Sequence, residues 1–182
     1  MPDLNPISPY GWMSHSMQVL AFWLLLIVSV VLMVYLAKLG APVDARLPSG
    51  TVNLEAPWST ERIRIALGLL GDDGIQAARR QTYADFAFLF VYPIAFSLGC
   101  ALIAGGLDGK NAAIGMLIAW AVLLALPFDA GENICMLRML DGHIGAPWPQ
   151  LATICAALKF TLTAGAALFL IVGAIERLAI HR

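Results

Sequence analysis

Residues 112–137 have the sequence AAIGMLIAWAVLLALPFDAGENICML, an apolar stretch that carries two carboxylates and one carboxamide near its end. The stretch is longer than the ~20 residues that a helix needs to cross the hydrocarbon core of a bilayer. An ionised side chain at the centre of such a helix costs roughly 2.5 to 3.5 kcal/mol on insertion scales. Polar residues at this depth therefore face the interior of a helix bundle, and we expect the functional site around Asp129, Glu132 and Asn133.

Three further stretches predict membrane-spanning helices. By inspection, the four spans cover residues 17–37, 83–105, 112–137 and 151–175. A chain with 60% hydrophobic and 13% charged residues does not have the composition of an ordinary water-soluble protein. We therefore predict an all-α integral membrane protein, a four-helix bundle that forms a single transmembrane domain over residues 1–182.

The distribution of cationic residues predicts the orientation of the spans. The side shared by the first and third connections carries seven cationic residues: Lys38, Arg46, Arg62, Arg64, Arg79, Arg80 and Arg138. The opposite side carries three: Lys110, Arg177 and Arg182. Short loops that are rich in Lys and Arg stay in the cytoplasm. We expect the protein in the bacterial inner (cytoplasmic) membrane, with both termini outside and with loops 38–82 and 138–150 in the cytoplasm.

The long connection 38–82 begins as an irregular segment with several Pro and Gly residues and then becomes helical. Ser59 is a candidate N-cap, and Gly71 is expected to end the helix that follows. The residues that share the apolar face of this helix are Ile63, Ala66, Leu67 and Leu70. The segment predicts an amphipathic connector along the membrane surface; the alternative is a lid over a cavity on the cytoplasmic side.

Helical geometry groups the buried polar residues. Asp129, Glu132 and Asn133 are three or four positions apart and share one face of a helix. With a rise of ~1.5 Å per residue, Lys159 in the fourth span lies at about the depth of Asp129. We predict an ion pair between Asp129 and Lys159, with Glu132, Asn133 and Asp85 hydrogen-bonded nearby.

Two other residues are placed by helical phase. Tyr92 is seven positions after Asp85 and is expected on the same face of the second span. Arg138 is half a turn out of phase with Asp129, so its side chain should extend to the membrane interface. Pro127 predicts a kink, and Gly131 predicts the close approach of another helix or of a ligand.

Neighbouring carboxylates can hold different pKa values and share a proton, which suits acid–base chemistry. We therefore take Asp129 and Glu132 as a candidate acid–base pair. The candidate ligand-binding residues are Asp85, Tyr92, Asn133 and Lys159. A purely structural role, in which these groups hold the helices together, is the alternative. No metal site is predicted, because no histidine falls within a span.

Several short segments together resemble a group of uncharacterised bacterial four-helix integral membrane proteins. The segments are Leu67-Gly68-Leu69-Leu70-Gly71, Arg80, Tyr83-Ala84-Asp85-Phe86-Ala87-Phe88, Tyr92-Pro93 and Asp129-x-x-Glu132-Asn133. The likeness covers about residues 59–140. The resemblance implies that the polar residues Asp85, Tyr92, Asp129, Glu132 and Asn133 of the second and third spans belong together, and it implies no activity or cofactor.

Three function classes fit these features. The first is a membrane protein that binds a lipid-like or small amphiphilic molecule at a buried carboxylate-lined site, with or without acid–base chemistry on it. The second is an accessory or assembly subunit of a larger membrane complex, and the third is a proton-coupled carrier. The expected partners are the lipid bilayer and other membrane subunits or a second copy, and no nucleic acid. No motif names a cofactor.

Overall fold

The computed structural model describes residues 7–180, with side chains up to residue 177. Arg182, which was counted in the prediction of orientation, lies outside the described residues. Within the described residues, four helical stretches are long and apolar enough to cross a membrane: His15–Asp44, Thr60–Ala104, Gly109–Leu140 and Trp148–Arg177. The prediction of an all-α membrane protein with four spans is confirmed, although each helical stretch is longer than the span inferred from hydropathy.

The chain divides into two compact units, and the prediction of a single domain stays a prediction. Among the described residues, unit 1 comprises residues 7–29, 91–125 and 160–180, and unit 2 comprises residues 30–90 and 126–159. Helices α1 (His15–Asp44) and α7 (Trp148–Ile180) contribute residues to both units.

Unit 1 contains α4 (Tyr92–Ala104), α5 (Gly109–Ala121) and the short 3-10 helix η1 (Val122–Leu124), together with parts of α1 and α7. Small residues let these helices pack closely. A Cβ atom on Gly115 would clash with the Phe169 ring, and one on Gly173 would lie 2.6 Å from Ile103. The predicted close packing of the last helix therefore occurs against helices of the same chain.

Unit 2 contains α2 (Val52–Glu55), α3 (Thr60–Phe88) and most of α6 (Ala125–Leu140), with the end of α1 and the beginning of α7. The Ser59 side chain accepts a hydrogen bond from the Arg62 amide at 3.3 Å, which confirms the predicted N-cap of α3. Ile63 and Leu70 are buried in the core of this unit, which confirms the predicted apolar face.

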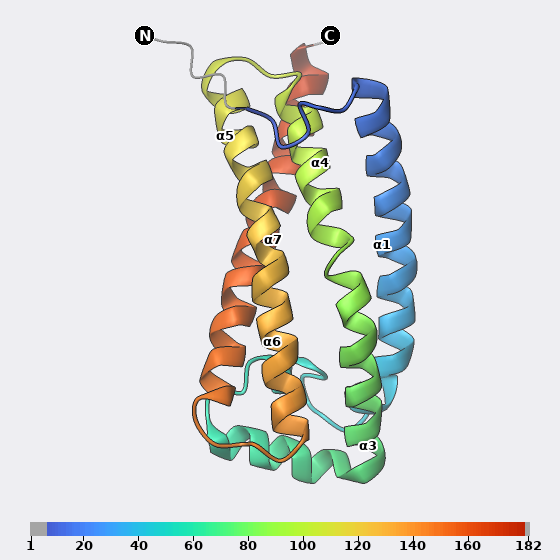
Figure 1. Ribbon diagram of the computed structural model, residues 1–182, viewed down its shortest axis with the longest axis vertical. Coiled ribbons are helices and arrows are strands. Elements are labelled where there is room, and N and C mark those ends of the chain that lie inside the picture. The colour runs from blue at the N-terminus through green and yellow to red at the C-terminus, as the bar shows by residue number, and fades with distance from the viewer. Residues whose placement is uncertain (1–6, 181–182) are drawn as a thin grey trace. The chain divides into compact units, whose positions relative to one another are not determined.

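Gly71 interrupts α3, as predicted. Its backbone has φ 60° and ψ −178°, a conformation that glycine adopts without steric cost. The helix changes direction near this residue (Figure 1). The break leaves carbonyl groups without helical partners, and the Arg46 guanidinium donates a hydrogen bond to the Leu70 carbonyl at 2.8 Å. The connection between the first two spans is thus held to α3 by a specific contact.

The second span is not one uninterrupted helix. α3 ends at Phe88, and α4 begins at Tyr92 with Pro93 in its first turn, where proline is well tolerated. The third stretch also contains an irregularity, because η1 separates α5 from α6 immediately before Pro127. Proline cannot donate its amide to the carbonyl four residues earlier, in this case that of Leu123 in η1. The predicted disturbance at Pro127 is therefore present as a 3-10 turn.

Candidate functional site

An ion-paired group of three side chains lies at the centre of the site in unit 2. The Lys159 ammonium on α7 lies 2.9 Å from Asp129 Oδ1 and 2.9 Å from Glu132 Oε1, both on α6. The three side chains are only 10%, 3% and 1% exposed, respectively. The predicted pair between Asp129 and Lys159 is confirmed, and the same ammonium also binds Glu132.

The packing of α6 against α7 explains how the ammonium reaches both carboxylates. Asp129 and Glu132 are three residues apart, so they project from adjacent turns of α6 on one face. Gly131 lies where α7 comes closest, because a Cβ atom there would lie 3.2 Å from Cys155 Sγ. Cys155 and Lys159 are four residues apart on α7 and share a face. The close approach predicted at Gly131 is thus that of another helix.

A second polar contact joins α6 to α3. The Asn133 side-chain amide donates a hydrogen bond to Asp85 Oδ2 at 2.8 Å. Asn133 is buried, and Asp85 is half-buried. This contact confirms the prediction that Asp85 and Asn133 are hydrogen-bonded close to the ion pair.

One carboxylate oxygen in the site has no partner. Among the described residues, Glu132 Oε2 is buried without a hydrogen-bond partner, although Glu132 Oε1 accepts a hydrogen bond from Lys159. A buried polar atom that lacks a hydrogen bond costs about 1 to 3 kcal/mol, and more when it is charged. Almost all buried polar groups in proteins are satisfied, so this oxygen marks a place for an additional proton or donor.

A small cavity lies beside the Asp85–Asn133 contact. Its volume is about 30 Å³, and its lining residues are Thr51, Glu55, Gln81, Thr82, Asp85, Asn133 and Met136. A cavity of this size holds about one water molecule or a group of similar dimensions. The lining is largely polar and includes two carboxylates, which suits a small cationic or hydrogen-bond-donating group.

The short helix α2 forms one wall of this cavity and contributes Glu55, which was not predicted as a site residue. Burial raises the pKa of the Glu55 carboxyl above its ordinary value of 4.5, an effect that Lys159 opposes and Asp129 reinforces. Glu55 is the only acidic residue between Ala45 and Ser59. A single acidic residue in this segment was a feature that the sequence offered. Helical periodicity could not place Glu55, because the segment is irregular. The lid, which was the alternative to a connector along the membrane surface, stays a prediction.

Two other predicted residues, Tyr92 and Arg138, have different outcomes. Tyr92 belongs to unit 1, and its predicted phase with Asp85 required one continuous helix, which the break after Phe88 removes. A role for Tyr92 in ligand binding stays a prediction. The Arg138 guanidinium lies 5.7 Å from the centre of the Trp148 ring, so it is directed away from the ion pair, as predicted. His143, on the loop after α6, is exposed.

Comparisons with protein-family models, with curated proteins and with solved structures found no match. The resemblance to bacterial four-helix membrane proteins therefore stays a prediction. The description of the site rests on its own geometry: a shared ammonium, an oxygen without a partner and a cavity the size of one small polar group.

Proposed function

We propose that the protein binds a small amphiphilic molecule in the membrane, and that the carboxylates of unit 2 take its cationic head group. The observation that carries this proposal is the buried Glu132 oxygen that has no hydrogen-bond partner. A bound primary ammonium supplies three donors, of which one would satisfy this oxygen.

The charge balance of the site supports a cationic ligand. Unit 2 brings four carboxylates together around a single ammonium; they are Glu55, Asp85, Asp129 and Glu132 around Lys159. Charges that are removed from water need compensating partners. When all four carboxylates are ionised, negative charge is in excess, and a cationic group or additional protons would balance it.

Glu55 and Asp85 line the cavity and Glu132 does not, so the size of the cavity limits the part of the head group that reaches Glu55 and Asp85. A volume of about 30 Å³ accommodates a water-sized group. A primary ammonium meets this limit, whereas a trimethylammonium group is larger and has no N–H donor for a carboxylate. The proposed site therefore prefers primary amines to quaternary ones, and the apolar tail of the ligand lies among lipid-facing side chains.

Helix α2 closes the site on one side, and Thr51 and Glu55, at its two ends, line the cavity. Leu54 is 1% exposed and holds this segment in the core of unit 2. Entry of a ligand past α2 requires this short helix to move, which is the role expected of a lid. Glu55 would then accompany the lid and close over the bound cation.

In an enzyme, the same site would carry out acid–base chemistry on the bound amine. The Glu132 carboxylate would take one proton from the ammonium, which leaves a neutral amine and a neutral carboxyl group. Lys159 and Asp129 would hold Glu132 in position during this transfer. The alternative functions, an accessory subunit and a proton-coupled carrier, stay predictions.

Native mass spectrometry of the purified protein tests binding directly. We expect dodecylamine to form a saturable complex, and dodecyltrimethylammonium and dodecanol to bind at least about tenfold more weakly, because each lacks either the N–H donors or the charge. Glu132→Gln should abolish the preference for dodecylamine. Glu61→Gln removes the same charge from an exposed position and serves as the control. Asp85→Asn provides a second variant of the same site. Equal binding of all three amphiphiles to the unmodified protein would contradict the proposal.

A further inference from the structure

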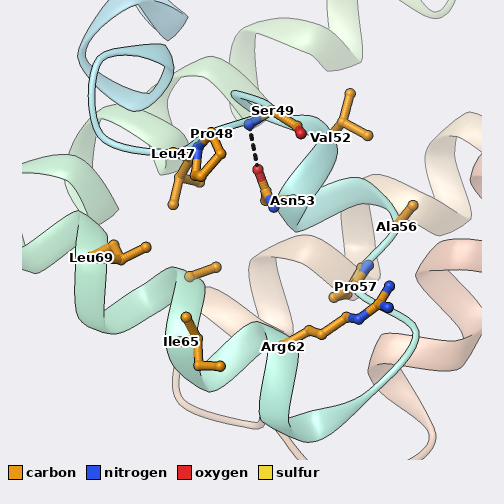
Figure 2. A pocket seen from close by; sticks show the side chains of 11 residues that line it. Leu47, Pro48, Ser49, Val52, Asn53, Ala56, Pro57, Arg62, Ile65 and Leu69 are labelled. Carbon is orange, nitrogen blue, oxygen red and sulfur yellow. Dashed lines mark hydrogen bonds between the residues drawn. The ribbon is translucent and has the colours of Figure 1, made fainter.

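A second and larger pocket lies between the connection after α1 and the first turns of α3. Its volume is about 380 Å³, within the ~300 to 1,000 Å³ range of small-molecule sites. Figure 2 shows residues 47–57 on one side of it and the α3 residues Arg62, Ile65 and Leu69 on the other. All of its lining residues belong to unit 2.

The wall of the pocket is mostly apolar. Leu47 and Pro48 contribute from the connection, and Ile65 and Leu69 contribute from α3. Ile65 and Leu69 are each 54% exposed, although both are large hydrophobic residues. Exposed apolar side chains on an amphipathic helix beside membrane spans are typical of a helix that lies in the membrane interface. The pocket is therefore positioned to admit part of a lipid.

Arg62 is the only charged residue of the lining. Its neighbour Arg64 forms an ion pair with Glu61, whereas the structure records no ion pair for Arg62 among the described residues. Figure 2 shows the Arg62 side chain extending from α3 toward Pro57, at the edge of the pocket. An arginine in this setting is suited to a phosphate group, which its guanidinium can bind through two parallel hydrogen bonds.

Asn53 adds an uncharged donor to the same pocket. Its Oδ1 atom accepts a hydrogen bond from the Ser49 amide at 2.9 Å, which leaves its NH₂ group as a donor. Asn53 is half-buried and lines the pocket together with Arg62. The pocket thus combines one cation, one amide donor and an apolar wall.

The helix α2 separates this pocket from the carboxylate cavity. Thr51 and Glu55 line the small cavity, whereas Val52, Asn53 and Ala56 line the large pocket. The two sites have opposite charge, since acidic groups line one and Arg62 lines the other. The large pocket therefore suits an anionic ligand, whereas the small cavity suits a cationic ligand.

We infer that the large pocket binds an anionic phospholipid. The phosphate lies at Arg62 and Asn53, and the adjoining glycerol and the beginning of an acyl chain lie against Leu47, Ile65 and Leu69. The pocket encloses only part of the lipid, and the rest of the lipid stays in the bilayer. Anionic lipids are the natural partners of a basic residue on an interfacial helix.

Native mass spectrometry with palmitoyl-oleoyl phosphatidylglycerol and the matching phosphatidylcholine tests this inference. We expect phosphatidylglycerol to bind about tenfold more tightly, because both lipids carry the phosphate but the trimethylammonium group of phosphatidylcholine neutralises that charge and is repelled by Arg62. Arg62→Gln should remove the preference, and Arg62→Lys should keep part of it. Arg64→Gln is the matched control, since it removes the same charge two positions away on an exposed side chain.

Three outcomes would overturn the inference. The first is an unchanged preference in Arg62→Gln, and the second is an equal loss in Arg62→Gln and Arg64→Gln, which would indicate general attraction to a basic surface. The third is displacement of phosphatidylglycerol by an equal concentration of inorganic phosphate, which would indicate a site for free anions. The result is separate from the proposed amine site, because Glu132→Gln should leave the preference for phosphatidylglycerol unchanged.

Discussion

Lys159 binds Glu132 through one of the two carboxylate oxygens, at 2.9 Å, and the other oxygen is buried without a hydrogen-bond partner in the part of the chain that the structure describes. The same ammonium also binds Asp129. A pair that served only to join α6 to α7 would not require a second buried carboxylate with an unused oxygen, because desolvation of the extra charge opposes folding. This asymmetry is the main reason to regard the cluster as a binding site.

Replacement of Lys159 by methionine should strongly destabilise the protein. The substitution leaves Asp129 and Glu132 buried without a cation, and breaking a buried pair in this way costs about 3 to 5 kcal/mol. Thermal unfolding in detergent, followed by circular dichroism, measures the effect. Lys110→Met removes an exposed lysine and should change the melting temperature little; equal losses in the two variants would show that the ion pair contributes nothing specific.

Gly131→Leu should also destabilise the protein, because the new side chain would separate α6 from α7. A Cβ atom alone would lie 3.2 Å from Cys155 Sγ, and overpacking of this kind costs about 1 to 3 kcal/mol. Gly165→Leu provides the control, since no other helix of the described chain has an atom within 4 Å of a Cβ built at that position. The same unfolding measurement compares the two variants, and a Gly131→Leu protein as stable as Gly165→Leu would disprove close packing at Gly131.

Glu55 should make stability depend on pH in a defined direction. Burial raises the pKa of its carboxyl in the folded protein above 4.5, so the folded state binds the proton more tightly than the unfolded state does. The contribution of Glu55 to stability is therefore full below pH 4.5 and is lost as the pH rises through the raised pKa. Glu55→Gln should flatten this part of the stability profile, measured by unfolding at a series of pH values.

The exposed carboxylate of Glu61, in its pair with Arg64, supplies the comparison for that profile. Glu61→Gln should leave the slope above pH 4.5 as it is in the unmodified protein. A profile for Glu55→Gln that matches the unmodified protein at every pH would show that Glu55 is not buried against the site.

Helical periodicity and depth were sufficient to predict the centre of the site. Asp129, Glu132 and Asn133 lie on a regular part of α6, where a spacing of three or four residues defines a shared face. Lys159 could be assigned to the same cluster because α6 and α7 cross the same apolar layer. The number of residues from the end of each span then gives the depth of a side chain. Regular helices thus made the ion pair predictable from residue types and spacing.

Helical phase predicts less where the backbone departs from regular helix. Residues 89–91 lie outside both α3 and α4, so the spacing of seven residues does not by itself place Tyr92 on the face of Asp85. Pro93 was the available signal, since proline favours the first turn of a new helix. Glu55 could not be placed at all, because the position of α2 depends on the burial of Leu54 and on other tertiary contacts.

The central claim is that the second oxygen of Glu132 belongs to a ligand, and infrared difference spectroscopy tests it most directly. Addition of dodecylamine to the purified protein should change the carboxylate absorption, because a new N–H donor then binds Glu132. We predict that this change is absent in Glu132→Gln and retained in Glu61→Gln. A difference spectrum that is the same in Glu132→Gln and in the unmodified protein, while Glu132→Gln only lowers the melting temperature, would contradict the claim and leave Glu132 as a structural residue.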